Sequence, residues 1–272
     1  MFNDEFTGST LNSNVWFNGV TAESARTYDS NNDRNYIDNS AVSVSDGVLT
    51  LTSSTATNEK GGTDYIGADI RSRGNVAFGY GYVEIKAKLP EGVNHSASLW
   101  LEGNRTEDKP YASEVDIFET LGRENQIVPD VHVWYTSDSQ SLPDWITNNT
   151  PDNVYDDQNK SEFDMSSGFV TDVADAASQY HIYGCEWTPE TITLYLDGEA
   201  YATYDLTSSD IFTSLAGGEL LSLALGNGYY NPNDNTNATT FPTEYVIDYV
   251  RLYQKQDGRL SGKAIADKRD MS

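Results

Sequence analysis

The stretch Tyr82-Val83-Glu84-Ile85-Lys86-Ala87-Lys88-Leu89 alternates apolar and polar side chains without interruption. Successive side chains of a β-strand point to opposite faces, so this alternation predicts a strand with one dry and one wet face. Thr191–Leu196 alternates in the same way and is turned into a second strand by Asp197-Gly198. Ala41–Thr52 is divided into two further strands by Ser45-Asp46-Gly47. The sequence therefore predicts several antiparallel hairpins.

The rest of the chain also favours strands over helices. In Tyr245–Tyr253 every residue except Asp248 and Arg251 is apolar or aromatic, which predicts a buried final strand. No stretch predicts a long amphipathic helix, and Val173–Ala177 is expected to form only a turn or two. Short antiparallel strands joined by polar connections are typical of a two-sheet sandwich or a jelly roll.

The chain shows no internal repeat and no linker that would divide it. Residues 1–254 are therefore expected to form one domain. Residues 255–272 leave the strand pattern and become mildly basic, so they are expected to be a tail or the start of a linker. Residues 136–172 form the longest polar stretch and are expected to be a large surface loop.

Composition and charge argue against several classes of protein. The 272 residues include 17 Lys+Arg and 42 Asp+Glu, which gives a formal net charge of −25. A nucleic-acid partner is disfavoured, because neutralising phosphates requires clustered basic residues. A membrane is disfavoured too, since no apolar run approaches the roughly 20 residues that span a bilayer. Cys185 is the only cysteine, which rules out an intramolecular disulfide and a cysteine-based metal site.

Three acidic residues alternate with large apolar ones in Ser113-Glu114-Val115-Asp116-Ile117-Phe118-Glu119-Thr120. In a regular strand Glu114 and Asp116 share a face, whereas Glu119, five positions after Glu114, points to the opposite face. One extra residue at Ile117-Phe118 would return Glu119 to the first face, and β-bulges often lie beside active sites. The spacing therefore predicts a bulge and a line of three carboxylates on one face.

A line of carboxylates suits hydrolysis of a glycosidic bond with retention of configuration. This reaction needs two carboxyl groups roughly 5–5.5 Å apart; one attacks the anomeric carbon, and the other protonates the leaving oxygen and later activates water. The shorter Asp116 between the glutamates would hydrogen-bond the nucleophile and help to separate their two pKa values. An acidic surface strand and a calcium-binding cluster are the alternatives. Three carboxylates on a half-buried strand are, however, costly without a function.

The same segment resembles the Glu-x-Asp-x-x-Glu signature of glycoside hydrolase family 16. The resemblance covers nearly the whole chain and extends to Phe2–Phe6 with Trp16, Arg71–Gly74, Phe78–Pro90, Tyr183–Pro189, Leu194–Gly198 and Tyr245–Gln254. It implies an all-β jelly roll of two curved antiparallel sheets with an open concave cleft. By matching position, Glu114 is expected to be the nucleophile, Glu119 the acid/base and Asp116 their assistant. The implied activity is that of a retaining, endo-acting glycoside hydrolase.

The bulged form of the signature is similar to laminarinases, agarases, porphyranases and carrageenases. Glu186-Trp187-Thr188-Pro189 resembles laminarinases, whereas Ser98-Leu99-Trp100-Leu101 is closer to the galactan-cleaving branches. A strongly negative enzyme should repel a sulfated polymer unless Arg71 and Arg73 make a local positive patch. The leading expectation is an endo-β-1,3-glucanase. The alternatives are a galactan hydrolase (agarase, porphyranase, carrageenase or host-galactan endo-β-galactosidase) and a non-catalytic carbohydrate-binding module.

Six residues are expected to bind substrate: Asn32, Arg71, Trp100, His132, Trp134 and Trp187. Trp100 and Trp187 are predicted to stack on sugar rings, with a core tryptophan as the alternative for each. His132 and Trp134 share one face of a strand, and His132 resembles the family's cleft histidine. Arg71 and Asn32 match cleft positions of the family that bind hydroxyl or acidic groups.

Catalysis is expected to need no cofactor. The family resemblance implies a structural Ca²⁺ on the convex face, bound by Glu5, the Gly47 carbonyl and Asp248, because oxygen ligands suit calcium. For Asp248 the alternative is a cap on a neighbouring loop. The expected partner is a polysaccharide, bound by a monomer. The acidic surface suits a salty or extracellular medium, so the protein is expected to be secreted, although no signal peptide is visible in this chain.

Overall fold

Buried and half-buried side chains alternate along many strands of the computed structural model. The structure describes residues 2–18, 28–136, 142–148, 153–155, 160–164, 169–231, 240–254 and 259–262. Strand β8 (Gly81–Lys88) shows the clearest alternation, because every second side chain is buried. The strand that was expected over Tyr82–Leu89 is confirmed, with bounds shifted by one residue.

One sheet, called here the outer sheet, contains β8 and most of the predicted hairpins. Its strands lie in the spatial order β4 (Val42–Ser45), β5 (Val48–Thr57), β19 (Thr243–Tyr253), β8, β15 (His181–Trp187), β16 (Thr191–Leu196) and β17 (Glu199–Asp205). β1 (Phe2–Asp4) pairs with the last part of β19. All these pairings are antiparallel, as the hairpin pattern predicts.

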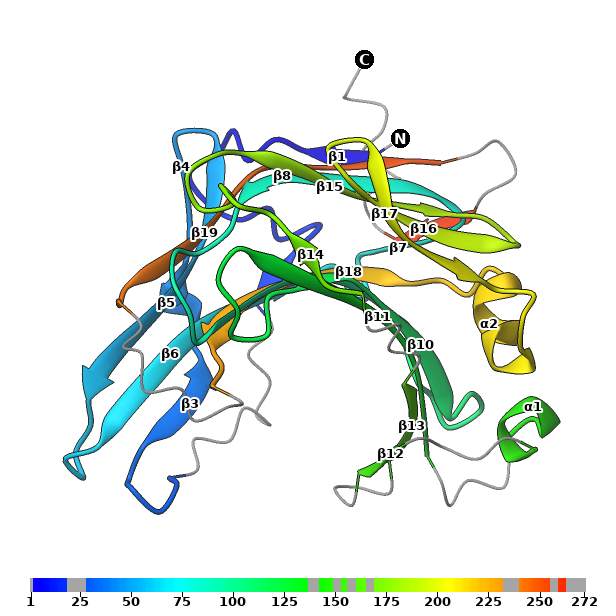
Figure 1. Ribbon diagram of the computed structural model, residues 1–272, viewed down its shortest axis with the longest axis horizontal. Helices are drawn as coiled ribbons and strands as arrows, with labels where there is room; N and C mark the ends of the chain where they lie inside the picture. The colour runs from blue at the N-terminus through cyan, green and yellow to red at the C-terminus, as the bar shows by residue number, and fades with distance from the viewer. Residues whose placement is uncertain are drawn as a thin grey trace.

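The second, inner sheet carries the acidic segment. Its strands lie in the order β2 (Phe17–Asn18), β6 (Thr63–Arg71), β18 (Ser222–Tyr229), β9 (His95–Glu102), β10 (Tyr111–Glu119), β11 (Gln126–Thr136), β13 (Lys160–Asp164) and β12 (Asn153–Tyr155). β3 (Arg34–Ile37) pairs in parallel with β6, and β14 (Thr171–Asp172) pairs with the start of β11. Figure 1 shows this sheet arching from β6 to β11, with its concave face turned away from the outer sheet.

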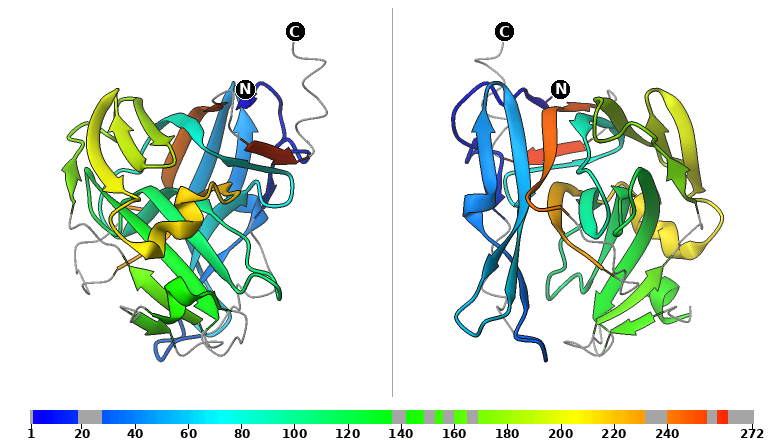
Figure 2. Two further views of the ribbon diagram at one scale, coloured as in Figure 1. Left: turned by 90° about the vertical axis from the view of Figure 1, so that its right-hand side faces the viewer. Right: turned by 60° about the vertical axis from the view of Figure 1, so that its left-hand side comes forward.

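The two sheets are joined directly and enclose one core. β5 pairs with β19 through its first half and with β6 through its second half, so this hairpin passes from one sheet to the other. Leu49 and Leu51 of β5, Ile85 of β8 and Leu99 and Leu101 of β9 are all 0% exposed in the core. One face of the inner sheet is therefore buried against the outer sheet (Figure 2), which leaves the opposite face for ligands. The expected β-jelly roll is confirmed.

Tight turns form where the sequence predicts them. Asp46 and Gly47 have φ values of 53° and 79° between β4 and β5, and Asp197 and Gly198 have 51° and 86° between β16 and β17. A left-handed backbone at both central positions matches the twist of two-residue hairpins, and Asp and Gly tolerate it best.

Short elements complete the described part of the fold. They are β7 (Val76–Gly79), β20 (Arg259–Gly262), the 3₁₀ helices η1 (Asn39–Ala41) and η2 (Asp210–Phe212), and the α-helices α1 (Asp144–Thr147) and α2 (Thr213–Ala216). Among the described residues no helix is long and apolar enough to cross a membrane.

Two polar segments contain strands that the sequence pattern does not predict. Within residues 136–172, expected to be a loop, β13 pairs with β11 and β12 pairs with β13, which widens the inner sheet. Within residues 255–272, expected to be a tail, β20 pairs with β7. Ladder hydrogen bonds use only backbone groups, so an edge strand can form without an apolar pattern.

Candidate active site

The predicted bulge is present in β10. On the side of β9, Asp116 pairs with Trp100 but Phe118 already pairs with Leu99, so one residue of β10 is extra. The register with β11 shifts over the same interval, between Asp116 and Glu119. Ile117 and Phe118 are both 0% exposed. The extra residue therefore turns Glu119 back toward the face of Asp116, as the spacing of the acids predicts.

Aromatic side chains of the outer sheet hold this bulge from the core side. The Tyr201 hydroxyl of β17 donates a hydrogen bond to the Ile117 carbonyl. The Phe118 ring packs on Tyr183 of β15, with ring centroids 4.5 Å apart, and on Tyr245 of β19 at 6.2 Å. A bulge interrupts the ladder and leaves backbone groups that need other partners. The position of Glu119 therefore depends on contacts with the other sheet.

Tyr201→Phe is expected to lower kcat about tenfold with little change in KM, because a loosened bulge misplaces Glu119 during proton transfer. It should also cost roughly 1–3 kcal/mol of stability, since the Ile117 carbonyl stays buried without its donor. Tyr245→Phe is the matched control: its hydroxyl has no hydrogen-bond partner within the described residues. Steady-state kinetics and thermal unfolding test this, and equal kcat values for the two variants would contradict it.

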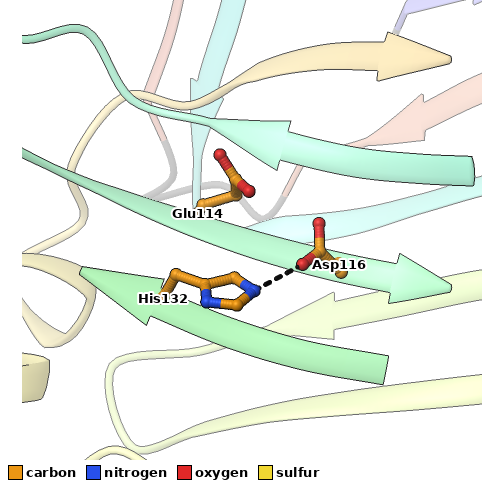
Figure 3. A group of neighbouring side chains, drawn as sticks. All are labelled: Glu114, Asp116 and His132. Carbon is orange, nitrogen blue, oxygen red and sulfur yellow. Dashed lines mark hydrogen bonds and ion pairs between the residues drawn. The ribbon is translucent and has the colours of Figure 1, made fainter. Parts of the chain in front are cut away.

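Asp116 and His132 form a hydrogen-bonded pair beside Glu114. His132 lies directly opposite Glu114 on β11, and its Nε2 is 2.8 Å from Asp116 Oδ2. Figure 3 shows the His132 ring reaching Asp116, with Glu114 nearby on the same strand as Asp116. One ligand atom from each lies within 4.8 Å of the other two, and this is the one such group found among the described residues. His132 and Asp116 thus orient each other next to Glu114, and the assisting role of Asp116 stays a prediction.

The surroundings raise the pKa of both glutamates. Burial and the negative charge of Asp116 hold the pKa of Glu114 well above its ordinary value. Burial and Asp116 also raise the pKa of Glu119 to about 8; His132 opposes this rise and Asp130 adds to it. Carboxyl groups coupled in this way share protons as a set. The site therefore retains a proton near neutral pH, which a general acid requires.

The alkaline limb of the pH–activity profile is expected near pH 8, where Glu119 loses its proton. Because the protonated form is active, kcat/KM should fall roughly tenfold per pH unit above that value. Asp130→Asn removes a charge that raises the pKa of Glu119, so its limb should move to lower pH. Initial rates from pH 4 to about 10 measure this. Asp108→Asn, at an exposed loop residue, is the control, and an unmoved limb in Asp130→Asn would refute the assignment.

The concave face next to the acids carries an aromatic ring and a basic group. Asp116, Trp100, Ala224 and Arg71 follow one another in register across β10, β9, β18 and β6. The Arg71 guanidinium lies 5.5 Å from the centroid of the Trp100 ring. A Cβ on Gly226 would lie 3.4 Å from that ring, so the small residues of β18 leave room for it. Trp100 is half-buried and forms part of the surface that a sugar would contact.

His132 and Trp134 share the concave face of β11, as their spacing predicts. Their ring centroids are 5.8 Å apart and the planes are tilted by 30°. Trp134 lines a pocket together with Glu114 and Arg71. The structure therefore brings four of the six predicted substrate-binding residues, Arg71, Trp100, His132 and Trp134, to the acids.

Glu102 belongs to this site, although the sequence reasoning did not select it. It is 5% exposed and lies directly opposite Glu114 in the register of β9 and β10. Its Oε2 accepts hydrogen bonds from Arg71 at 3.0 Å and Arg73 at 2.6 Å. Arg71 also binds Asp69, at 2.7 Å. The sequence does offer a signal for this residue: Glu102 lies two residues after Trp100, so both side chains point to the same face of the strand.

Two predicted substrate-binding residues lie away from the acids; the expectation for Trp187 is wrong, and the one for Asn32 stays a prediction. Trp187 is 1% exposed; it packs on Phe78 and Tyr80, and its Nε1 donates to the Leu215 carbonyl at 3.2 Å. Alternate side chains of β15 point to opposite faces of the sheet, and Trp187 falls on the face that is turned to the core. The Asn32 carbonyl accepts a hydrogen bond from Asn58, at the far end of β6 from Arg71. That end is about 26 Å away along the strand.

The predicted calcium ligands lie on or next to strands that pair with β19 or on β19 itself. Glu5 comes directly after Asp4 of β1, which pairs with Val250. Gly47 lies just before the part of β5 in which Leu49 pairs with Ile247. Each carboxylate already binds a basic side chain, Arg251 for Glu5 at 2.9 Å and Lys86 for Asp248 at 2.6 Å. A calcium ion would have to displace both, so calcium binding here stays a prediction.

A pair of glutamates on one bulged strand of a concave jelly-roll face, with an acidic assistant between them, is the arrangement of a retaining glycoside hydrolase. A family model described as "Beta-porphyranase A-D, GH16 domain" matches residues 1–255. The chain belongs to glycoside hydrolase family 16.

Curated relatives carry the names of a β-glycanase and a β-glucanase. "Endo-1,3-1,4-beta-glycanase EglC" of Rhizobium meliloti (strain 1021) is 29% identical over 216 residues, which are 78% of this chain and 39% of that protein. "Beta-glucanase" of Rhodothermus marinus is 25% identical over 207 residues, 71% of this chain and 64% of that protein. The chain thus spans about two fifths of the length of the first of these relatives.

Solved structures of laminarinases share the fold. The laminarinase catalytic domain of Thermotoga maritima MSB8 superposes with a TM-score of 0.66 at 23% identity, covering 94% of this chain and 98% of that one. The laminarinase of Flavobacterium sp. UMI-01 gives a TM-score of 0.67 at 18% identity, covering 93% and 99%.

Proposed function

We propose that this protein is an endo-acting β-glycanase that hydrolyses its polysaccharide by a retaining double displacement. The observation that carries the proposal is the bulge in β10, which brings Glu119 to the face of Glu114 and Asp116. The concave face of the inner sheet suits cleavage within a chain. Membership of glycoside hydrolase family 16 supports the same reaction.

The reaction divides between the two glutamates. Glu114 attacks the anomeric carbon as its bond to the leaving oxygen breaks, and Glu119 gives its proton to that oxygen. Glu119, now ionised, then takes a proton from water, whose oxygen attacks the anomeric carbon and releases Glu114. Asp116 is hydrogen-bonded to His132, and its proximity is one cause of the raised pKa of Glu119, which favours a retained proton there.

The leading substrate is a β-1,3-linked glucan. The names of the curated relatives, endo-1,3-1,4-β-glycanase and β-glucanase, support it. The charge of the site supports an uncharged polymer as well. Arg71 and Arg73, the expected positive patch, are ion-paired with Asp69 and Glu102, so their charges are balanced within the site.

A galactan is the second candidate, and a specific finding favours it: the matching family model is described as porphyranase. Arg105, which lines the pocket beside Glu114, would supply a cation for an acidic substituent. Burial and the nearby Arg73 lower the pKa of Arg105. An anion in this pocket would favour the charged guanidinium, so an acidic galactan is chemically compatible with it.

A polysaccharide panel with product sizing tests both candidates. Laminarin, a mixed-linkage β-glucan, agarose, porphyran and κ-carrageenan would be incubated with the wild type and with Glu114→Gln. Release of mid-sized oligosaccharides from laminarin, lost in the variant, is the expected result. Cleavage of agar-type polymers alone would overturn the glucan assignment. Binding without any cleavage would favour the third alternative, a carbohydrate-binding module.

Three further properties are proposed for the same protein. Its net charge of −25 keeps copies apart and suits an extracellular medium, which supports a secreted monomer. Light scattering at two salt concentrations checks the monomer, and fractionation of the source organism checks the location. Calcium binding near Asp248 would raise the melting temperature relative to EDTA, and Asp248→Asn should remove that difference.

A further inference from the structure

A pocket of about 320 Å³ lies beside Glu114, where β9 passes into the loop that leads to β10. Its wall includes Glu102 of β9, Arg105 of the loop and Ser113 of β10. Glu119 is not among the described residues that line it. The pocket therefore adjoins the nucleophile rather than the acid/base.

Three polar atoms of this wall are buried and have no hydrogen-bond partner in the part of the chain that the structure describes. They are Glu102 Oε1, Arg105 Nη1 and Ser113 Oγ. Buried polar atoms are normally paired, and an unpaired one costs free energy. The three atoms complement one another, because they offer an acceptor, a donor and a hydroxyl that serves as either. Their gathering in one small pocket indicates a ligand that supplies the missing partners.

Surrounding contacts hold this set in place. The other oxygen of Glu102 binds Arg71 at 3.0 Å and Arg73 at 2.6 Å. The Gly103 N–H donates to the Ser113 carbonyl at 2.8 Å, which ties the loop to β10. Glu102 and Ser113 are 5% and 1% exposed. These contacts fix where Glu102 and Ser113 lie in the wall, so the set is largely preorganised for a ligand.

The unpaired donor and acceptor together favour a neutral hydroxyl over an anion. The two arginines that bind Glu102 are balanced by Glu102 and Asp69. A sulfate ester accepts from Arg105 but offers no proton to Glu102 Oε1, so it would leave that acceptor unpaired. A sugar hydroxyl, in contrast, donates to Glu102 and accepts from Arg105 at the same time.

We propose that Glu102, Arg105 and Ser113 form a specificity subsite that recognises one free hydroxyl of the sugar bound against Glu114. This rests on the proposed glycanase function and deepens it. A substrate that lacks this hydroxyl, or carries it as an ether or ester, leaves buried groups of the enzyme unpaired and is rejected. The subsite thus selects between glycans that differ in substitution at one position.

Two substitutions and a matched control test the subsite. Ser113→Ala and Arg105→Met each remove one of the three groups, and Ser53→Ala removes a buried hydroxyl that has no partner among the described residues and does not line the pocket. The substrates are an oligosaccharide of the polymer cleaved in the panel and its monodeoxy versions. On the intact oligosaccharide, kcat/KM should fall about tenfold for Ser113→Ala and up to about 100-fold for Arg105→Met. Ser53→Ala should leave it unchanged.

The monodeoxy substrate that lacks the recognised hydroxyl should have a low kcat/KM with the wild type. Neither variant should lower that value much further, because the hydroxyl that the mutated groups bind is already absent. Equal losses on every substrate, or no loss on any, would overturn the subsite. A loss confined to sulfated polymers in Arg105→Met alone would show an anion site instead. If the wild type cleaves nothing, the glycanase proposal fails separately, and calorimetric binding of a laminarin oligosaccharide and its monodeoxy versions decides the subsite. Binding reduced by both variants but not by Ser53→Ala would support it, and absence of binding would overturn it too.

Discussion

Glu114→Gln is expected to lower kcat/KM on the cleaved polysaccharide by on the order of 10⁵, the largest effect of any single substitution considered. The carboxylate oxygen of Glu114 forms the covalent bond of the first step, and an amide of the same size is a far weaker nucleophile. Thermal unfolding should show an intact fold, because the amide keeps the shape of a half-buried side chain. Reducing-end assays over several hours measure the residual rate.

The matched control is Glu244→Gln, which removes an exposed carboxylate of β19 and should leave kcat/KM unchanged. A smaller variant, Glu114→Gly, adds a stereochemical test. Azide can enter from the vacated face and displace the leaving group while Glu119 protonates it, which gives a glycosyl azide of inverted configuration. Full activity in Glu114→Gln, or a retained azide product from Glu114→Gly, would disprove the nucleophile assignment.

Glu119→Gln is expected to lower kcat on polysaccharide by about 10² to 10⁴, the usual contribution of general acid–base catalysis. For an aryl glycoside with an acidic phenol as leaving group, the first step of the variant should be nearly as fast as in the wild type. That leaving group departs without a proton. The second step still lacks a base for water, so a glycosyl-enzyme intermediate should accumulate. Rapid-mixing experiments would then show a burst of phenol.

Azide distinguishes this role from a structural one. It attacks the intermediate without needing a base, so it should restore turnover in Glu119→Gln and give a product of retained configuration. A variant that merely disturbs the bulge would not be rescued, and Tyr201→Phe provides that comparison. Equal losses on polysaccharide and aryl glycoside, without a burst, would contradict the acid/base role.

Much of the fold follows from local patterns in the sequence. The alternation of β8 determines which of its side chains are buried, and the Asp-Gly pairs determine where two hairpins turn. These features depend on side-chain parity and backbone conformation within a few residues. The bulge was predictable for the same reason, because Glu119 can join Glu114 on one face only if an extra residue is inserted.

The strands in polar segments were not predictable in this way. β12 and β13 join the sheet through strand pairing, and no alternating apolar pattern marks them in the sequence. Trp187 is expected in the cleft, but which face of β15 is buried depends on what packs against that sheet. Local sequence does not contain this information.

The sequence by itself determined the acids of β10, their spacing and the chemistry of a carboxylate pair. Only the tertiary structure decided what surrounds them. Glu102 meets Glu114 through strand pairing, and Arg105 reaches the same pocket from a loop. The Tyr201 hydroxyl reaches the bulge from the opposite sheet, 84 residues later in the chain. The physical reason is that pKa values and hydrogen bonds depend on distances of a few ångströms between residues far apart in sequence, and packing of the two sheets sets those distances.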